Sequence, residues 1–512
     1  MCFFLSKLYR MYHTFTDVPP VHPEKRPRWP QPLRSGAVIE LFKRCGDFNH
    51  RSIAVGLDQS ELVTVCWLDG LVSGEMVSDL VLRPLTERSR TGELTVESLA
   101  PLLLQGGIYA YTVQKRTQLD DVISDLCHGC CAIILDRPAL ALCFETRSAN
   151  VRAIGEPTLE KSLKGAKDAF VETLRTNTAL LRRRLATPSL KSVESSLGRK
   201  SSTRVALLYV EDVVSPELVR EVARRLDRLD VDAVLSTGEL EEVLSDAPRS
   251  PFPQVIHTER PDRFAQYLSQ GRVGLLVDGL PIGLIVPVSF AEFMKVNTDV
   301  SQHFLVASAL SVLRWLSLLL ALFLPASYVA MAMYHQEMIP TRLLLSIIEA
   351  KQNVPFSTLL EVLGMMLSFI MLQEAGLRLP NPIGDTVSII GALIVGQSAV
   401  EAQVVSPIAI IVVAVSGIAC YTLPSQDLAS AVRLSSILAL FAAALAGLYG
   451  VGLYACLLLW HLCSMDSFGL SYLAPLTEDR AGGLRRLLLR RPPHLRQLRD
   501  KLLKPRDRRR RA

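Results

Sequence analysis

The sequence lacks the short motifs that mark the common nucleotide-binding and hydrolytic enzymes. No GxGxxG, GxxxxGK[ST] or GxSxG occurs in its 512 residues. The first two motifs supply backbone N–H groups that hold phosphates, and the third positions a nucleophilic serine. We therefore expect a protein that is not an enzyme and that uses no cofactor.

Cysteine is present, but without a framework. The ten cysteines have no regular spacing, which is typical of reduced thiols in a cytosolic or membrane setting. One cluster, CHGCC at 127–131, could supply metal ligands, but no second Cys/His pair lies nearby in the sequence. The run CCAIILD reads more simply as a buried strand, so we expect no metal site.

A long apolar run is missing from the N-terminus. An apolar patch of only about four residues precedes Ser6 and Lys7, too short for the hydrophobic region of a secretory signal. We expect the N-terminal half to stay in the cytoplasm.

Aromatic residues are missing from the basic C-terminal tail. Residues 484–512 are dominated by arginine and lysine. Single-stranded nucleic acids are usually bound by basic grooves that also carry aromatic side chains, whereas a basic segment beside apolar spans usually contacts anionic lipid. We therefore expect membrane lipid as a partner of this tail, and no nucleic acid.

Apolar residues are abundant instead. They make up 49% of the chain, more than most soluble proteins carry, and this favours a membrane protein. The clearest span, 315–334, is free of charge and long enough for a hydrocarbon core of about 30 Å. Further apolar runs cover 355–380, 387–405, 406–424 and 434–462. The last run exceeds one crossing, so it would tilt, break at Gly450 and Gly452, or form two short spans.

The number of crossings follows from the charges. A basic tail belongs on the cytoplasmic side, and the N-terminal half lacks an export signal. With both ends on one side, the number of spans should be even, and four or six fits.

The first part of the chain alternates short apolar runs with turn residues. These runs predict strands at 52–57, 62–70, 131–137 and 139–146, with helices at 74–85 and 95–104. Residues 155–185 carry apolar residues at helical spacing and should be mostly helical. Residues 189–203 are rich in serine and lysine with little to bury, which favours a linker.

A second α/β module follows. We expect strands at 203–212 and 231–237, helices at 215–229, 238–246 and 260–271, and a hairpin within 272–290 that turns at Asp278 and Gly279. Ser215 should cap the first of these helices, with Pro216 in its first turn. The fold class is therefore an α/β soluble region of two subdomains followed by an all-α polytopic membrane domain.

The segment SPFPQVIHTERPDRF, 250–264, combines three prolines with alternating charges just before the apolar half of the chain. Pro251 and Pro253 favour an extended backbone, and Thr258, Glu259 and Pro261 are typical of a helix start. This explains the prolines but not every charge.

Several polar residues lie within or beside the apolar runs: Glu361, Glu374, Gln397, Glu401 and Arg314. A carboxylate facing lipid costs several kcal/mol, so each should face protein, water or a partner. Arg314 and Glu374 lie near segment ends, where snorkelling to the interface is the simpler explanation. Glu361, Gln397 and Glu401 are better candidates for a polar interior, either an ion path or a subunit contact.

The sequence resembles the membrane A subunits of the GerA-type spore germinant receptors, from about residue 35 to 475. The most specific match is PFPQ followed by TERPD, which contains Pro251, Phe252, Pro253, Gln254, Thr258, Glu259, Arg260 and Pro261. Other matches follow in order: LDGLV at 68–72, the block at 156–184, LPASYVA at 324–330, HQEMIPT at 335–341, QEAGLRLP at 373–380 and GALIVGQSAVEAQVVSP at 391–407.

The resemblance implies a polytopic protein of the inner spore membrane that assembles with a B subunit similar to amino-acid transporters and a C subunit lipoprotein. It also implies a homo-oligomeric ion channel that nutrients such as amino acids or sugars open during germination. In that picture Glu361, Glu374, Gln397 and Glu401 are candidates for a pore or a polar membrane interior, and residues 250–264 form a rigid joint to the membrane domain. The residue that binds the nutrient is unknown.

Two alternatives remain open. An accessory paralogue of the same family would act with dipicolinic acid transport without sensing nutrients, and a secondary transporter would carry soluble regulatory domains. A transporter usually shows repeated halves, and we find no internal repeat.

We divide the chain into an N-terminal tail (1–34), a first subdomain with a helical extension and linker (35–200), a second subdomain (201–304), a transmembrane domain (305–465) and a basic cytoplasmic tail (466–512).

Overall fold

The computed structural model describes residues 29–55, 61–90, 99–101, 113–147, 155–157, 160, 164–378, 396–477, 483–490 and 498–509. The chain forms two compact units. One comprises residues 1–150 with 186–188, and the other comprises 151–185 with 189–512. The second unit contains both the second α/β subdomain and the membrane helices.

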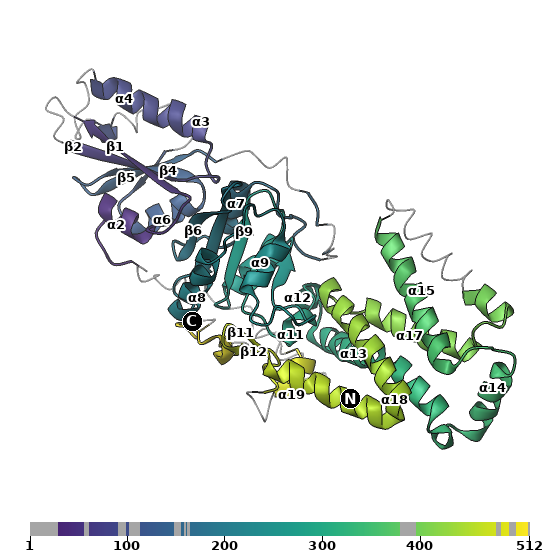
Figure 1. Ribbon diagram of the computed structural model, residues 1–512. Coiled ribbons are helices and arrows are strands. Elements are labelled where there is room, and N and C mark those ends of the chain that lie inside the picture. The colour runs from purple at the N-terminus through teal and green to yellow at the C-terminus, as the bar shows by residue number, and fades with distance from the viewer. Residues whose placement is uncertain are drawn as a thin grey trace, which may run out of the picture. The chain divides into compact units, whose positions relative to one another are not determined.

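The first unit is a five-stranded antiparallel sheet with helices on both faces (Figure 1). Its strands are β1 (Phe48–Val55), β2 (Glu61–Leu68), β3 (Val113–Arg116), β4 (Cys130–Leu135) and β5 (Leu140–Glu145). Its helices are α2 (Ser35–Leu41), α3 (Gly74–Met76), the π-helix η1 (Val77–Leu82), α4 (Arg83–Arg90) and α6 (Leu119–Cys127). The alternating side chains of the strands supply a core on each face, with Val65 and Ile133 packed beside Val77 and Val81.

The second α/β subdomain repeats this topology. Its strands are β6 (Leu190–Leu197), β7 (Thr203–Val210), β8 (Ile256–Thr258), β9 (Val273–Val277) and β10 (Gly283–Val286). Its helices are α7 (Leu174–Arg184), α8 (Pro216–Asp227), α9 (Thr237–Leu244) and α10 (Pro261–Leu268). The strand order of this sheet is β6-β7-β9-β10-β8, and that of the first sheet is β1-β2-β4-β5-β3. The two orders are the same once five is added to each strand number of the first sheet. The soluble region therefore holds a repeat of topology that inspection of the sequence does not reveal.

Most predicted elements are confirmed, including the strands of the first sheet, the hairpin at Asp278 and Gly279, and a helix that begins at Pro216. Ser215 occupies the cap position of that helix, but its side chain makes no capping hydrogen bond. The helix predicted at 95–104 lies mostly outside the described residues.

Three predictions of local structure are wrong. Residues 190–197, expected in a linker, form the edge strand β6, in which Lys191 and Ser192 are buried and Ser195 and Ser196 are exposed. Residues 231–237 form no ladder, because the carbonyl groups of Val231 and Asp232 accept hydrogen bonds from the turn after β6. Within 155–185 the described helix is Leu174–Arg184. Residues 166–171 are not helical, and Phe170 is buried in the core instead.

The membrane region consists of helices α13 (Phe304–Met333), α14 (Thr341–Lys351), α15 (Thr358–Arg378), α17 (Pro407–Tyr421) and α18 (Gln426–Ser464). In the described part of the chain, α13, α15 and α18 are long and apolar enough to cross a membrane, and α17 is a shorter apolar helix. Most of the run at 387–405 lies outside the described residues, and the even number of spans stays a prediction.

Helix α18 is two helices joined by a sharp bend (Figure 1). The backbone leaves helical geometry at Ala446 and Gly447, three residues before the predicted break at Gly450. Gly447 has φ +59°, and an added Cβ there would lie 2.8 Å from His335. Both ends of α18 therefore reach the second α/β subdomain, through Asp427 and His461.

The chain ends beside the second sheet. A short hairpin of β11 (Asp466–Ser467) and β12 (Leu470–Ser471) follows α18, and then come α19 (Gly483–Leu488) and the 3₁₀ turn η4 (Lys501–Leu503). Residues 498–509 lie against the α/β subdomain, since Arg506 N–H donates to the Val213 carbonyl and Arg499 Nε to that of Ser269. This part of the tail, predicted to contact lipid, contacts protein.

Candidate functional site: the joint at 250–264

The segment 250–264, here called the joint, connects α9 to α10 and contacts the membrane helices. Its glutamine holds the chain that leaves α9. Gln254 Oε1 accepts hydrogen bonds from the N–H groups of Asp246 and Ala247 at 3.0 and 3.1 Å, and Gln254 Nε2 donates to the Ala247 carbonyl. A side chain that satisfies three backbone groups of the turn after α9 explains why the motif contains an amide.

The first half of the joint lies on the end of α18. The Ser250 hydroxyl lies 2.8 Å from His461 Nε2, and the buried hydroxyl of Tyr472 donates to the Pro253 carbonyl at 2.7 Å. The Phe252 ring packs beside Phe290 and His461. The prolines keep this backbone extended, and the Pro253 carbonyl accepts its hydrogen bond from the Tyr472 side chain.

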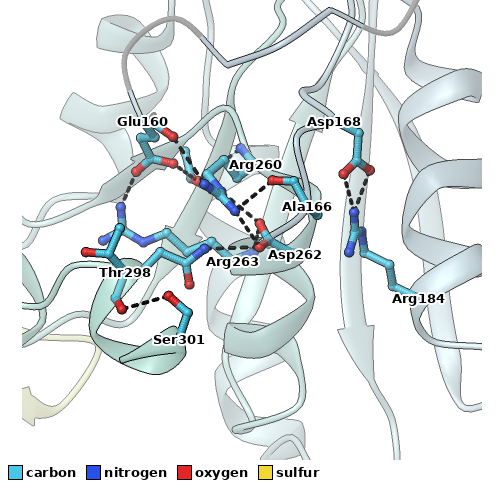
Figure 2. A network of polar contacts seen from close by, with 11 residues as sticks. Glu160, Ala166, Asp168, Arg184, Arg260, Asp262, Arg263, Thr298 and Ser301 are labelled. Carbon is cyan, nitrogen blue, oxygen red and sulfur yellow. Dashed lines mark hydrogen bonds and ion pairs between the residues drawn. The ribbon is translucent and has the colours of Figure 1, made fainter. Parts of the chain in front are cut away.

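Arg260 is the buried centre of the second half (Figure 2). Its side chain is 1% exposed, and it donates to both carboxylate oxygens of Asp262 and to the carbonyls of Glu160 and Ala166. Burial raises the pKa of Asp262, but the hydrogen bonds from Arg260 outweigh it and leave that pKa lowered. The charges that prolines alone did not explain thus form a buried network.

Glu160 joins this network from far away in the sequence. It pairs with Arg263 (Figure 2). It also accepts from the Thr258 hydroxyl at 2.5 Å, and the Glu259 carbonyl accepts from Phe170 N–H. The second half of the joint therefore fastens β8 and α10 to the segment that precedes α7.

His257 connects the joint to the first turn of α18. Its ring nitrogens lie 3.6 Å from Glu241 Oε2 on α9 and 3.5 Å from Asp427 Oδ2 on α18. Burial alone would lower the pKa of His257, but Asp427 and Glu241 outweigh it and leave the pKa raised. A protonated His257 thus bridges two carboxylates, one from the sheet side and one from a membrane helix.

The start of the first span carries a buried ion pair. Arg314 is 7% exposed, and it donates to Asp299 of α12 (Thr298–Ser301) at 2.7 Å. Arg490, from the segment after α19, donates to the carbonyls of Val300 and Gln302. Arg314 therefore faces a carboxylate of the protein, and its position at the membrane interface stays a prediction.

Glu361 makes contacts within the membrane region. It is 2% exposed; one oxygen accepts from the N–H and hydroxyl of Ser406, and the other lies 3.2 Å from Lys351 Nζ. Since Ser406 precedes α17, Glu361 links three helices of one chain. The interpretation of Glu361 as part of a pore stays a prediction.

The other candidates of the polar interior lie elsewhere. Gln397 and Glu401 are both exposed and share one helix face, where Gln397 Nε2 donates to Glu401 Oε1 at 3.0 Å. Glu374 is also exposed, on α15. Exposure of a Gln–Glu pair beside apolar helices is compatible with a path for ions or with a subunit contact.

Several residues that contact the joint or the start of the first span were not predicted. Five of these partners are Glu160, Asp427, His461, Tyr472 and Arg490. They lie between 98 and 219 positions from the residues they contact, and no local pattern reports such contacts. The only available signal was the presence of Glu160 within the block matched at 156–184.

The comparisons with known proteins cover most of the chain. The profile of the Bacillus/Clostridium GerA spore germination proteins matches residues 37–502. The chain is 35% identical to the uncharacterized membrane protein YfkQ of Bacillus subtilis, over 88% of this chain and 87% of that protein. It is 34% identical to spore germination protein B1 of the same organism, over 85% and 89%. Among solved structures, the N-terminal domain of the A subunit of the Bacillus megaterium spore germinant receptor GerK3 is similar, with 27% identity, a TM-score of 0.39, and coverage of 50% of this chain and 93% of that one.

Proposed function

The chain belongs to the GerA family of spore germination proteins, and from this premise we propose that it is the A subunit of a spore germinant receptor. In this proposal it resides in the inner spore membrane, with its soluble region and tail in the cytoplasm. It assembles with B and C subunits and with further copies of itself. Nutrient binding to the complex opens a path for ions.

The observation that carries the coupling part of this proposal is the set of contacts between the joint and both ends of α18. Ser250 meets His461 at one end, and His257 meets Asp427 at the other. Because α18 bends back at Gly447, one rigid segment of the α/β subdomain holds both ends of a membrane hairpin. A shift of that subdomain would therefore be transmitted directly to α18.

The test is potassium efflux from liposomes that contain the protein together with B and C subunits, before and after addition of amino acids and sugars. We expect flux only with a nutrient. Constitutive flux would argue against gating by a ligand. Silence of a complex whose assembly has been verified would overturn the channel and favour the accessory paralogue that acts with dipicolinic acid transport.

A further inference from the structure

Helix α14 exposes apolar side chains although it is too short to be a span. Leu343, Leu345 and Ile348 are 49%, 62% and 46% exposed. With 11 residues the helix is about 16 Å long, about half the thickness of a hydrocarbon core of roughly 30 Å. The exposure of these residues therefore needs an explanation other than a membrane crossing.

One side of α14 faces the membrane bundle. Leu344 and Ile347 line a groove together with Ala332 of α13, and Ile347 is buried. One turn later, Lys351 Nζ lies 3.2 Å from Glu361 Oε1 on α15. Leu344, Ile347 and Lys351 are spaced three and four positions apart, so they share one face of the helix. These contacts fix the rotation of α14 about its own axis.

The other faces of α14 differ in polarity. The face opposite the bundle is an exposed polar strip, which consists of Arg342, Ser346 and Glu349. Leu345 and Ile348 lie on one flank, between the polar strip and the bundle face, and Leu343 lies on the other flank. A helix with a charged, polar face and apolar residues beside it is typical of a segment that lies in the plane of a membrane surface.

The connections of α14 place it at a membrane boundary. It joins α13 to α15, and both are long and apolar enough to cross a membrane. A segment that joins two crossing helices lies at one face of the membrane. Exposed apolar residues continue on both sides of α14, with Met338 before it and Phe356 after it. The apolar flanks are therefore continuous in sequence with the apolar side chains that α13 and α15 expose.

Two tyrosines mark the same boundary. Tyr334 at the end of α13 and Tyr449 just after the bend of α18 are both exposed. They lie at one end of the bundle, because an added Cβ at Gly447 would lie 3.0 Å from Tyr334. Exposed tyrosines are enriched where a membrane meets water. The distance from Trp315 to Tyr334 along α13 is roughly 28 Å, close to the thickness of the hydrocarbon core.

The distribution of the exposed residues favours lipid over a protein partner. The core of a protein interface is a continuous apolar patch. On α14 the charged polar strip separates Leu343 from Leu345 and Ile348, so the exposed apolar side chains form two narrow flanks. Lipid can cover both flanks at once while the polar strip stays in water.

We propose that α14 is an interfacial helix that lies in the plane of the membrane, at the end of the bundle where α13 finishes and α18 bends. Its partner is the lipid surface, which covers Leu343, Leu345 and Ile348. The polar strip faces water, and the pair of Lys351 with Glu361 holds the helix against α15. The proposal needs α13 and α15 to cross the membrane, but it does not depend on the receptor function.

The experiment introduces the photo-crosslinking amino acid p-benzoylphenylalanine at one position at a time in the full-length protein in phosphatidylcholine nanodiscs. Mass spectrometry then identifies each adduct. At the position of Leu345 we expect lipid adducts in a yield similar to that at Leu360, an exposed residue of α15. Ile348, on the same flank, should behave like Leu345. Ser346, on the polar strip, should give severalfold fewer lipid adducts.

Leu235 is the matched control, since it is an exposed leucine of the second α/β subdomain and should give no lipid adduct. Adducts of Leu345 and Ile348 with a second copy of the chain, in place of lipid, would overturn the proposal and make α14 a subunit contact. Equal lipid yields at Leu345 and Ser346 would also overturn it, because the helix would then present no distinct faces to the membrane. A lack of lipid adducts at Leu360 would remove its premise that α15 crosses the membrane. None of these results involves ion flux, so the proposal and the receptor function can fail separately.

Discussion

Arg260 shows how a charged residue of the joint becomes structural. Its guanidinium is almost completely buried, and the ion pair with Asp262 and two carbonyl groups satisfy it. A buried pair of this kind gives little net stability compared with apolar residues, but losing one partner leaves an uncompensated charge in the interior. The motif TERPD therefore tolerates change at Arg260 poorly.

We expect Arg260→Ala to lower the stability of the second α/β subdomain by about 3–5 kcal/mol, because Asp262 loses its partner inside the protein. The measurement is the thermal unfolding midpoint of the full-length protein in detergent. Arg224→Ala is the control, since Arg224 makes an exposed ion pair with Glu221 and should change little. Equal midpoints for the two variants would contradict the structural role of Arg260.

His257 makes the contact with α18 sensitive to pH. Its folded-state pKa is raised by Asp427 and Glu241 despite burial, so the protonated form is favoured in the folded protein. A raised pKa contributes stability that is complete below the unfolded value, near 6.5, and is lost as the pH rises through the folded value. Glu241, whose pKa burial raises, and Glu242 are the other titratable groups near this contact.

We therefore expect the unfolding midpoint of the wild type to fall as the pH rises from about 6 to 9, the range around an ordinary histidine pKa. His257→Gln should remove most of this slope. His128→Gln, which replaces an exposed histidine of the first unit, should keep it. A slope that persists in His257→Gln would show that another group governs it.

Glu401 offers a test of the ion path. In its exposed pair with Gln397 it supports no buried contact, so Glu401→Gln should leave assembly intact and alter potassium release if Glu401 faces the path. Efflux from liposomes with the B and C subunits measures this. Glu337→Gln changes another exposed carboxylate beside the membrane helices and is the control. Unchanged flux at normal protein levels would remove Glu401 from the pore.

Helix α18 shows why one glycine can determine the course of a membrane segment. Gly447 has φ +59° and ψ −142°, a conformation open essentially to glycine, and His335 and Tyr334 lie against its Cα. The Tyr334 hydroxyl donates to the Ala444 carbonyl, close to the bend. The reversal therefore depends on backbone freedom at Gly447 and on the end of α13.

Gly447→Ala should destabilise the α18 hairpin by at least about 1–3 kcal/mol, because the new Cβ both strains the backbone and meets His335. Gly452→Ala is a matched control, since a Cβ at Gly452 meets nothing within 4 Å. The thermal midpoint in detergent and the yield of folded protein would report the difference. Similar behaviour of the two variants would place the reversal elsewhere.

The success of sequence reasoning differs between elements for physical reasons. The apolar strands β4 and β5 and the long helices α13 and α15 carry strong periodic or continuous patterns, and they were predicted. Strand β6 was missed because most of its residues are polar, and its buried Lys191 and Ser192 give no apolar signal. The helix before Leu174 was wrongly extended because tertiary contacts hold Phe170 elsewhere. The joint was found as a motif, but its partners Glu160 and Tyr472 lie 98 and 219 residues away from the groups they contact.

The C-terminal segment of the second unit packs on its α/β subdomain. Arg499 organises residues 499–509 by donating to the carbonyl of Asp507 and to its carboxylate, and it also reaches the Ser269 carbonyl next to α10. A tail that was predicted to lie on lipid is thus held by backbone contacts to the α/β subdomain. This arrangement needs one particular arginine, whereas attraction to lipid depends only on the number of positive charges.

That difference gives a prediction. Arg499→Gln should release residues 499–509 and speed tryptic cleavage at Arg506 and Arg508 severalfold, because cleavage in a folded segment requires it to open first. Arg508→Gln removes the same charge while keeping the contacts that Arg499 makes, so cleavage at Arg506 should stay slow. Mass spectrometry of the full-length protein in nanodiscs follows both sites. If the two variants and the wild type were cut at equal rates at Arg506, charge rather than the Arg499 contacts would govern the tail.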